Sequence, residues 1–594
     1  MQLLKKYLHP YVLRMVLGLT VKITGTVMDL FLPWILSFMI DEVVPRRQLN
    51  EILLYGGLMF FCSLVAWLGN ITANRMASAV ARDAVQHVRY DLFRRISYLS
   101  CQQIDDFTIA SLESRLTSDT YHLHQMIGMM QRLGIRAPIL LLGGIALTLF
   151  LEPALALVLI SVLPFVALIT FRTSRKSIPL YAQLQGALDQ MVRVVRENAA
   201  GIRVIKALSK TDYEKERFSQ VNQQVVKREK AAAVMMAKTN PLMNLFLNTG
   251  LTMIVVVGAF RVYYGQSQTG TILAFLTYIT IILNAMLSIN RMFVIYSKGI
   301  ASAHRIEEIL EAPEELINRE PADHARPVQA EFPHIEFSHV SFSYGCGPAC
   351  SDEERNGTVG EAAKRGRVLS DVSFSLMRGE TLGIIGATGS GKSTLIQLLM
   401  RFYDPQEGSI RIDGCDVRTI CTDVLHRKFG IAFQNDVLFS DTIGENIRFG
   451  REISDERIWQ AAQQAQAGEF IKRLPKGMEH PLTIRGSNLS GGQKQRLLIA
   501  RALAGEPEIL ILDDSSSALD YRTDAQLRKA LHREGSNTTT IVVAQRVSSI
   551  RNADKIIVLQ AGRVIGCGTH ELLLNTCQSY RKISQSQMGG MEHA

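Results

Sequence analysis

The sequence has few features of a secreted or disulfide-bonded protein. Its 594 residues contain eight cysteines, and none falls in a predicted external loop, which argues against a disulfide framework and for a reducing compartment. Cys346 and Cys350 stand close together, but two thiols are too few for a structural zinc site, so free thiols are favoured over a metal site. The opening MQLLKKYLHPYVLRM lacks a signal-peptide cleavage site. We expect it to be an amphipathic lead-in to a first membrane span.

Acidic residues are outnumbered, and the net charge is +10. A basic chain can indicate a nucleic-acid partner. Here the basic residues lie between long apolar blocks rather than on one stripe, which is typical of a protein in a lipid bilayer with Lys and Arg on the cytoplasmic side. We therefore expect a lipid bilayer and no nucleic acid among the partners.

Long apolar runs are confined to the first half of the chain. A length of 594 residues alone suggests about four domains, but the hydrophobic pattern indicates two, a membrane domain over residues 1–300 and a water-soluble α/β domain over residues 335–594. Six runs are long enough to cross a bilayer. They lie at about 11–40, 52–74, 134–151, 154–172, 241–264 and 270–297.

Proline is scarce in the charged segments after the second and fourth spans, residues 75–133 and 173–240. The helical pattern continues through both segments without caps or breakers. We predict long helical extensions that leave the bilayer and return, in preference to two separate soluble subdomains. Only Glu152 and Pro153 separate the third and fourth spans, so the external loops are short and leave no external domain.

Residues 301–334 are predicted to be the linker between the two domains. The segment SKGIASAHRIEEIL is helical in pattern, and a polar, proline-rich stretch follows Pro313. Within the second domain, residues 345–367 are rich in glycine and charge and have no periodicity, which predicts a flexible surface insertion.

A phosphate-binding loop is the most specific motif in the chain. The short apolar strand TLGII leads into a glycine loop that fits G-x-x-x-x-G-K-[ST], and LIQLLMRF then continues as a helix, which is the context that confirms such a loop. Its backbone N–H groups and the helix N-terminus bind phosphates, Lys392 reaches the β- and γ-phosphates, and Ser393 ligates Mg²⁺. The loop comprises Gly386, Ala387, Thr388, Gly389, Ser390, Gly391, Lys392, Ser393 and Thr394.

Two further segments complete the nucleotide-site signature. The apolar strand ILIL ends in Asp513, the carboxylate on the Mg²⁺ side of such folds. A separate motif, LSGGQ, precedes the basic helical segment KQRLLIARAL; it comprises Leu489, Ser490, Gly491, Gly492 and Gln493.

The combination GATGSGKST, LSGGQ, ILILDD and SALD resembles an ATP-binding-cassette (ABC) domain, and the six-span half before it resembles the membrane domain of ABC exporters. SRLTSD, ENAAGIRVIKAL and AHRIEEIL are similar to that family's intracellular loops and linker, and GTHELL to its cassette tail. The likeness covers nearly the whole chain. The implied fold class is a membrane α-helical domain with six transmembrane helices and long cytoplasmic extensions, fused to an α/β P-loop nucleotide-binding domain.

This resemblance implies further roles. Tyr344 stacks on adenine, and Gln434 approaches Mg²⁺ and the membrane domain. In this family two cassettes close head to tail, and each ATP lies between one chain's phosphate loop and the other chain's LSGGQ. The loop that faces the partner is Ser517, Ala518, Leu519 and Asp520.

Two catalytic positions depart from the family pattern. The usual glutamate after the Mg²⁺ aspartate is Asp514, and the usual switch histidine is Gln545. A base must lie within hydrogen-bond reach of the attacking water, and aspartate is one methylene shorter. Glutamine cannot hold a proton as histidine can. We predict that this half-site binds ATP and Mg²⁺ but hydrolyses ATP slowly or not at all.

The LSGGQ motif, in contrast, is intact and can complete a neighbour's site. A complete LSGGQ motif together with an impaired catalytic half-site predicts a heterodimer, in which a second ABC half-transporter supplies the glutamate and the histidine. The expected activity is ATP-driven export of amphipathic drugs, lipids or peptides across the cell membrane, with the cassette in the cytoplasm. The alternatives are an importer on an exporter fold, of the siderophore type, and a regulatory ABC subunit that does not transport.

Charged residues inside the spans are candidates for the substrate cavity. Lys22 and Asp29 lie seven residues apart in the first span and share a helix face, and Arg291 lies in the sixth span. Intramembrane charges usually face a water-filled cavity or a partner. For Lys22 the alternative is that its amine extends to the inner interface, and for Arg291 it is a structural role at the membrane edge.

Overall fold

A computed structural model describes residues 2–313, 316, 332–345, 367–434, 437–515, 519–534 and 537–588. The chain forms two compact units. The first contains Met1–Tyr98 and Ile109–Ala312, and the second contains Leu99–Thr108 and Pro313–Ala594. The predicted insertion, apart from its two end residues, and most of the polar linker lie outside the described residues, as do Cys346, Cys350, Ser517 and Ala518.

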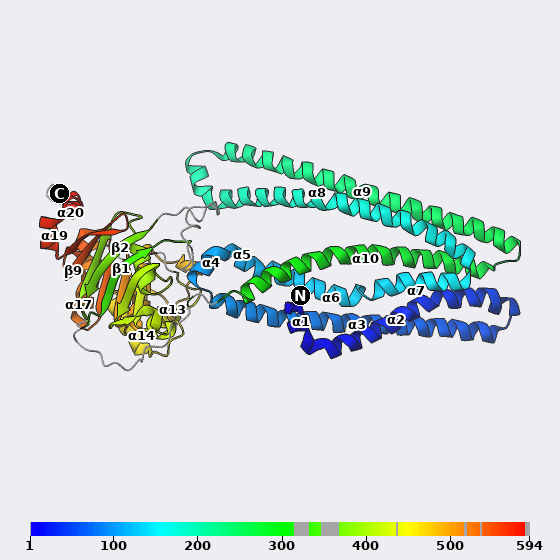
Figure 1. Cartoon of the computed structure of the whole chain (residues 1–594), viewed down its shortest axis with the longest axis horizontal. Coiled ribbons are helices and arrows are strands. Elements are labelled where there is room, and N and C mark those ends of the chain that lie inside the picture. The colour runs from blue at the N-terminus through cyan, green and yellow to red at the C-terminus, as the bar shows by residue number, and fades with distance from the viewer. Residues whose placement is uncertain are drawn as a thin grey trace. The chain divides into compact units, whose positions relative to one another are not determined.

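The first unit is entirely helical (Figure 1). Six of its helical stretches are long and apolar enough to cross a membrane, which confirms the predicted six-span architecture. Its helices are α1 Gln2–Leu8, α2 Val12–Phe38, α3 Leu49–Ser97, α5 Ile109–Ser114, α6 Thr120–Leu133, α7 Arg136–Leu151, α8 Pro153–Ala207, α9 Thr211–Tyr263 and α10 Thr269–Leu310.

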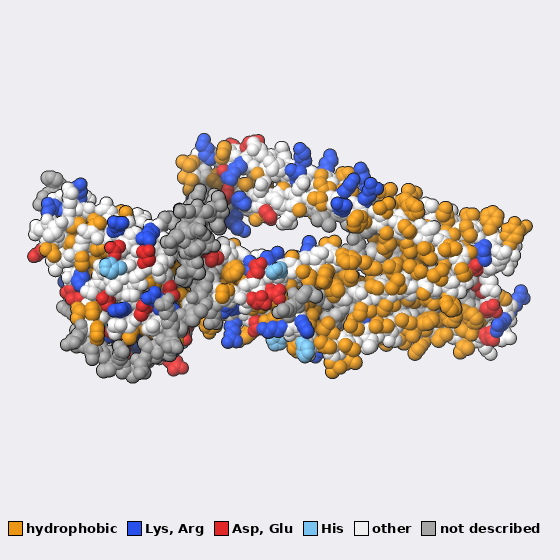
Figure 2. Space-filling view, in the orientation of Figure 1, with side chains coloured by type: hydrophobic (Ala, Val, Ile, Leu, Met, Phe, Trp, Pro, Cys, Tyr) orange, Lys and Arg blue, Asp and Glu red, His pale blue; other side chains and the backbone are white. Residues whose placement is uncertain are grey.

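Three of these helices are much longer than a bilayer requires. Helices α3, α8 and α9 have 49, 55 and 53 residues, which corresponds to about 74–83 Å at 1.5 Å per residue, against a hydrocarbon core of about 30 Å. The predicted long extensions are therefore present, but the expectation that residues 75–133 lack caps and breaks was wrong, because α3 ends at Ser97 and Ser100 caps a new helix. Hydrophobic side chains cover one broad zone of the helices in Figure 2, and charged side chains gather beyond it.

The second unit contains two sheets. The antiparallel sheet has the order β2-β1-β4-β5, with β1 Ile335–Phe342, β2 Leu369–Leu376, β4 Glu407–Ile412 and β5 Cys415–Asp416. The other has the order β10-β9-β3-β8-β7-β6, with β3 Thr381–Gly386, β6 Phe429–Ala432, β7 Ile509–Asp513, β8 Thr539–Val543, β9 Lys555–Gln560 and β10 Arg563–Gly568. In this larger sheet only β10 runs antiparallel to its neighbour.

Helices cover the larger sheet, and the strands of both sheets contribute to one apolar core. Strand β7 is buried at all five positions, as expected for a parallel strand with both faces covered. The helices of this unit are α4 Cys101–Phe107, α11 Lys392–Leu399, α12 Thr422–Arg427, α13 Ile443–Arg448, α14 Asp455–Gln464, α15 Gly468–Arg473, α16 Gly491–Ala504, α17 Tyr521–Glu534, α18 Val547–Ile550, α19 His570–Thr576 and α20 Gln578–Met588.

Helix α4 belongs to the second unit although it lies within the sequence of the membrane half. Ser100 caps it through a capping box with Gln103. Tyr403 Oη donates a hydrogen bond of 2.8 Å to Asp105 Oδ2, and Cys101 packs against the core of the sheets. The helical pattern of residues 75–133 did not predict this association, because side-chain periodicity does not reveal a distant partner.

Candidate functional site

The carboxyl ends of β3, β8 and β7 lie next to one another because these strands are adjacent and parallel. Ligands of open α/β sheets bind at this edge. The phosphate loop follows β3, and Gln545 follows β8. Asp513 is the last residue of β7, and Asp514 comes directly after it. The tertiary structure therefore gathers three segments that lie up to about 160 residues apart in the sequence.

The phosphate loop has the backbone that its glycines allow. Gly389 and Gly391 have φ angles of 81° and 100°, a region that residues with a Cβ rarely adopt. Gly391 is the N-cap of α11, so the helix N-terminus faces the loop. At Gly386 a Cβ would lie 2.3 Å from Leu559 O, which explains why this position is glycine.

Two side chains of the loop fit an anionic ligand. Lys392 Nζ donates hydrogen bonds of 2.9 Å to both Gly386 O and Ala387 O, which holds the ammonium group inside the loop. Burial lowers the pKa of Lys392, while Asp513 and Asp514 act in the opposite direction. Ser390 is buried, and its Oγ has no hydrogen-bond partner among the described residues. A buried hydroxyl without a partner is costly, and a phosphate oxygen would satisfy it.

The donor set beside the loop suits Mg²⁺. The Ser393 hydroxyl is hydrogen-bonded to the Asp513 carboxylate, and burial raises the pKa of Asp513. Asp513 is 5% exposed. Hydroxyl and carboxylate oxygens are the hard ligands that Mg²⁺ takes when phosphates supply the rest, and a cation there would relieve the cost of burying this charge.

Asp514 accepts hydrogen bonds from both glutamines that the sequence singled out. Gln545 Nε2 lies 2.8 Å and Gln434 Nε2 lies 3.3 Å from the same oxygen, Asp514 Oδ2. The backbone N–H of Asp514 is fixed to Val543 O at 2.9 Å, and its φ is 48°, in the left-handed region. Burial raises the pKa of Asp514, which Lys392 and Gln545 partly oppose.

A residue near the C-terminus holds the turn that carries Gln545. Gln587 Nε2 donates to Gln545 O, and Gln587 Oε1 accepts from Val547 N, both at 2.8 Å. Gln587 is not among the site residues predicted from the sequence. No local pattern identifies it, since the pairing joins residues 42 positions apart.

Tyr344 lies against the helix that begins at the phosphate loop. Its hydroxyl donates to Gln397 Oε1 at 2.6 Å and lies 3.0 Å from Thr394 Oγ1. Its ring makes edge contacts with Phe342 and Tyr403, with centroids 5.0 Å and 5.3 Å away. The structure thus brings Tyr344 to the loop region. Its role in adenine stacking stays a prediction.

The LSGGQ segment forms the start of α16. Ser490 is the N-cap and forms a capping box with Gln493, whose Oε1 accepts from Ser490 N at 2.9 Å. Leu489 is buried in the core, whereas Gly491 is exposed. The motif therefore presents backbone N–H groups and a helix N-terminus at the surface, which is a favourable arrangement for an anion. The S-x-x-Q spacing already contained this capping box.

The loop predicted to face a partner is only partly described. Ser517 and Ala518 lie outside the described residues, and Leu519 is buried. Asp520 Oδ1 accepts from Thr523 N at 2.9 Å at the start of α17. Hydrogen bonding to Thr523 lowers the pKa of Asp520.

The charged candidates in the spans differ in their surroundings. Lys22 is buried and bonded to Asn70 and Asn74, so its amine does not extend to an interface. Asp29 forms an ion pair with Arg136 at 3.1 Å. Arg291 is exposed on α10 and takes no part in this network as far as the described residues show.

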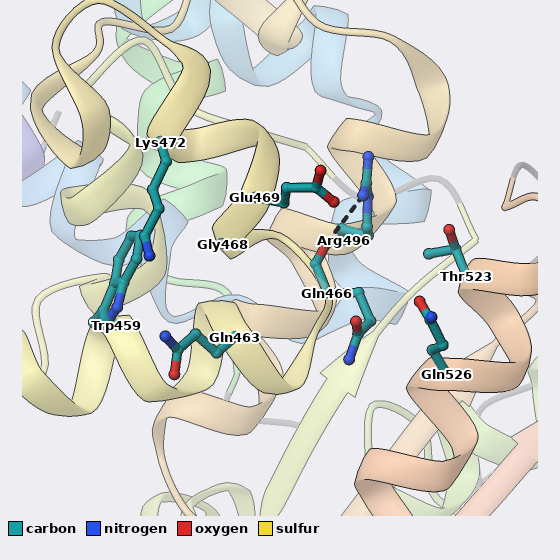
Figure 3. Close-up of a pocket in the computed structure, with 9 residues that line it drawn as sticks. All are labelled: Trp459, Gln463, Gln466, Gly468, Glu469, Lys472, Arg496, Thr523 and Gln526. Carbon is teal, nitrogen blue, oxygen red and sulfur yellow. Dashed lines mark hydrogen bonds between the residues drawn. The ribbon is translucent and has the colours of Figure 1, made fainter.

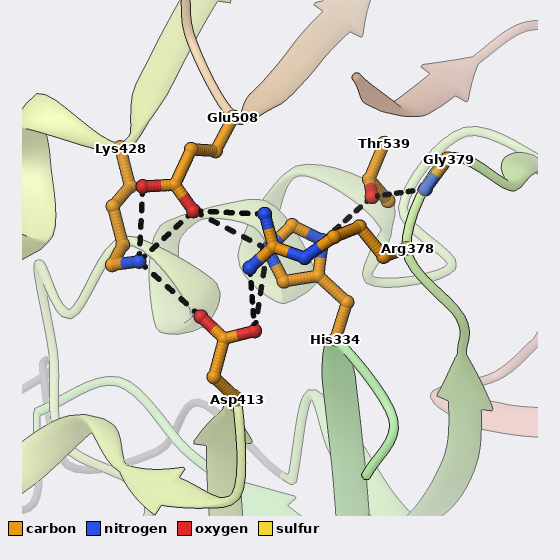
Figure 4. A network of polar contacts seen from close by, with 7 residues as sticks. All are labelled: His334, Arg378, Gly379, Asp413, Lys428, Glu508 and Thr539. Carbon is orange, nitrogen blue, oxygen red and sulfur yellow. Dashed lines mark hydrogen bonds and ion pairs between the residues drawn. The ribbon is translucent and has the colours of Figure 1, made fainter. Parts of the chain in front are cut away.

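Two other polar regions of the cassette do not form an equivalent site. A pocket of about 290 Å³ lies beside α16, where Arg496 Nη1 donates to Gln466 O and Lys472 lies over the Trp459 ring (Figure 3). The side chains that line this pocket include both acidic and basic groups, and none of them is strongly buried. A second region, around His334, is shown in Figure 4.

The His334 cluster resembles a cation site in composition only. His334, Asp413 and Glu508 offer ligand atoms within 4.8 Å of one another. Lys428 already contacts both carboxylates at 3.2 Å and 3.0 Å, and Arg378 contacts them at 2.8 Å and 3.2 Å. A divalent cation would have to displace these two positive charges, so we interpret the cluster as an ionic link between the two sheets.

Comparison with known proteins agrees with this geometry. Residues 15–286 match the ABC transporter transmembrane region, and residues 369–517 match the ABC transporter family. The uncharacterized ABC transporter ATP-binding protein YfiB of Bacillus subtilis is 35% identical over 99% of both chains. YknU of the same organism is 31% identical over 98% of this chain and 97% of its own length. An uncharacterized ABC transporter ATP-binding protein of Mycobacterium tuberculosis is 30% identical over 98% of both chains.

The fold is also that of a solved exporter. A bacterial Atm1-family ABC exporter with ATP bound has a TM-score of 0.76 and 24% identity, with 100% of this chain and 99% of that chain covered. The six-span helical unit and the cassette define an ATP-binding membrane transporter, and its fold is the one seen in that exporter. The chain belongs to the ABC transporter family.

Proposed function

We propose that this chain is the hydrolysis-impaired subunit of a heterodimeric ABC exporter in the cell membrane. Its own phosphate loop binds MgATP, and its LSGGQ segment completes the hydrolytic site of a partner half-transporter. The partner supplies the catalytic glutamate and the switch histidine. The cargo is amphipathic, and the cassette lies in the cytoplasm.

The observation that carries the proposal is the pair of amide N–H groups on Asp514 Oδ2. A general base accepts a proton from water through an oxygen that can approach it. Here one carboxylate oxygen is engaged by Gln545 and Gln434, and the backbone of Asp514 is tied to β8. Moving the carboxylate back from the attacking water by about one ångström can reduce the rate by about 10²-fold.

The second position supports the same conclusion. Gln545 has an amide in place of an imidazole, so it can donate a hydrogen bond but cannot gain or release a proton. In this structure its N–H is directed to Asp514. A homodimer would contain two such sites, whereas a heterodimer would contain one impaired site and one complete site.

Apolar side chains on the α8–α9 hairpin support association with a second chain. Beyond the predicted spans, both helices expose residues that a monomer would be expected to bury. They are Val192, Val195, Ile202, Val204, Tyr213, Val226 and Val234, each between 45% and 66% exposed. A partner half-transporter of the same family would cover such a surface.

The test is co-purification followed by ATPase measurement of the full chain alone and with its partner in lipid nanodiscs. We expect nucleotide binding but negligible turnover by the chain alone, and brisk turnover by the pair. Flux of a fluorescent amphipath in inverted vesicles then decides the direction of transport. Rapid ATP hydrolysis by the isolated chain would refute the proposal, and uptake in place of export would refute the direction alone.

A further inference from the structure

The membrane unit contains a polar cluster where α2, α3 and α7 pack together. Lys22 Nζ donates to Asn70 Oδ1 at 2.8 Å and to Asn74 Oδ1 at 3.0 Å. Asn70 Nδ2 lies 3.4 Å from Asp29 Oδ2, which also accepts from Arg136 Nη2 at 3.1 Å. Lys22 is 2% exposed, so its charge is fully removed from water.

Close packing between α2 and α3 explains why Lys22 is enclosed. At Gly25 a Cβ would lie 3.3 Å from Ala66 O, and at Gly69 a Cβ would lie 3.3 Å from Val21 O. These two glycines let the helix backbones approach one turn from Lys22. The amine is therefore held between the helices by amide oxygens and has no direct acidic partner among the described residues.

The cluster carries more positive than negative charge. The charged groups near enough to influence Lys22 are Asp29, Arg132 and Arg136, and of the three cations only Arg136 contacts the Asp29 carboxylate. Arg132 Nε donates only to Gly128 O, at 3.0 Å, among the interactions of the described residues. Charges inside a membrane domain are costly and usually mark a functional pathway, and an uncompensated positive charge requires an anion.

Arg136 is the group best placed to receive that anion. Its side chain is 38% exposed, and its Nε is buried without a hydrogen-bond partner in the described structure. A guanidinium has five N–H donors, and it binds carboxylates and phosphates through two parallel hydrogen bonds. The single bond to Asp29 leaves most of these donors available.

The depth of the cluster indicates where the anion enters. Arg136 begins α7, which ends at Leu151, so it lies about 22 Å from the external end of that helix. Lys22 lies ten residues from the start of α2, about 15 Å along the axis. Both positions correspond to the cytoplasmic side of the bilayer, where anionic head groups are enriched.

We propose that Lys22, Arg132 and Arg136 form a binding site for the anionic head group, a phosphate or a carboxylate, of an amphipathic compound on the cytoplasmic side of the membrane unit. The site rests on the proposed export function and names the chemical class of its cargo. Asn70 and Asn74 hold the lysine, and Asp29 orients Arg136.

The test is equilibrium binding of radiolabelled dodecyl phosphate to the full chain in phosphatidylcholine nanodiscs without ATP. We expect dodecyl phosphate to bind at least about tenfold more tightly than dodecyl maltoside or dodecyltrimethylammonium, because charge-assisted hydrogen bonds are the stronger ones. Arg136→Gln should remove most of this preference, and Arg136→Lys should retain part of it. Equal binding of the three amphipaths, or an unchanged preference in Arg136→Gln, would overturn the site.

Two further variants guard against misfolding and against a simple charge effect. Arg132→Gln removes one cation without breaking the Asp29–Arg136 pair, and it should also weaken dodecyl phosphate binding. Arg14→Gln is the matched control, because it also removes one arginine charge, but Arg14 lies at the start of α2, is 50% exposed and pairs with Asp83 at 3.1 Å. If Arg14→Gln weakens binding as much as Arg132→Gln does, the specific site is refuted.

The source of the head group is decided by lipid composition. Replacing part of the phosphatidylcholine by phosphatidylglycerol should displace dodecyl phosphate from the wild type if the site accepts membrane lipid. If phosphatidylglycerol does not compete, the site still accepts the anionic group but only from a free amphipath. The binding assay needs no ATP, so its failure leaves the proposed asymmetry of hydrolysis untouched, and brisk hydrolysis by the isolated chain would leave a positive binding result intact.

Discussion

Two regions of the cassette differ in how well they suit their predicted roles, which are phosphate binding in one and ATP hydrolysis in the other. The phosphate loop and the N-terminus of α16 have the groups that suit phosphates, namely backbone N–H groups, helix N-termini and, in the loop, a lysine. The region at the ends of β7 and β8 would have to place a base against a water molecule, and there the chain has Asp514 and Gln545 where the resemblance to the ABC family predicts glutamate and histidine. Binding tolerates small displacements, whereas proton transfer does not.

The largest effect should come from damaging the intact region. Gly491→Asp places a carboxylate at the exposed first position of α16, where an acid is compatible with the helix but repels a phosphate. We expect the ATPase rate of the purified pair to fall by about 10²-fold or more. An unchanged rate would show that this LSGGQ segment does not serve the partner's site.

Restoring the family residues should raise hydrolysis at the impaired site. With the partner's own site disabled, the double change Asp514→Glu and Gln545→His should increase single-turnover hydrolysis by about 10²-fold. The single change Asp514→Glu is the control, because it extends the carboxylate but leaves Gln545 in place. If the double variant is as slow as the wild type, these two positions do not account for the impairment.

Removing the carboxylate should change little by comparison. In the pair, Asp514→Ala should alter the ATPase rate by less than about twofold, since this side chain makes no interaction specific to the transition state. Lys392→Ala is the matched control and should abolish nucleotide binding to the same loop, which is measured by trapping of labelled ATP. Loss of turnover with Asp514→Ala would contradict the asymmetric arrangement.

The smallest effect concerns the ionic link between the sheets. His334 is buried, with Nδ1 2.6 Å from Thr539 Oγ1, and burial lowers its pKa below the ordinary 6.5. The unfolded chain therefore takes up a proton first as the pH falls below 6.5, so stability should decrease in this window.

The measurement for this link is thermal unfolding of the full chain at a series of pH values below neutrality. His334→Asn keeps a hydrogen-bonding group but does not titrate, so its unfolding temperature should depend less on pH in this window. Lys428 and Arg378 lower the pKa of Glu508, so the titration of this carboxylate affects stability only at lower pH. Identical pH profiles for variant and wild type would refute the role of His334.

Much of the fold followed from local patterns in the sequence. The six spans are long apolar runs. In a bilayer they form helices, because a helix satisfies all backbone hydrogen bonds within the segment. Strand β3, the loop and α11 were predicted because the glycine spacing is specific to one backbone path. The tight turn predicted between the third and fourth spans is also present, since α7 ends at Leu151 and α8 begins at Pro153.

Other features depend on distant residues and could not be predicted. Helix α4 packs with the cassette through Asp105 and Tyr403, which are almost 300 residues apart. Gln587 holds the turn of Gln545. Lys22, which the sequence left open between a cavity and an interface, is enclosed by two asparagines of the next helix.

The sequence by itself determined that the chain has an apolar helical half and a complete phosphate-loop motif, and it predicted the catalytic positions to be Asp514 and Gln545. Each of these features depends on adjacent or regularly spaced residues. Only the tertiary structure decided that both glutamines donate to one oxygen of Asp514, and that Lys22 is bonded to Asn70 and Asn74 beside the Asp29–Arg136 ion pair. Such convergence depends on how strands and helices pack, and packing joins residues whose separation along the chain carries no periodic signal.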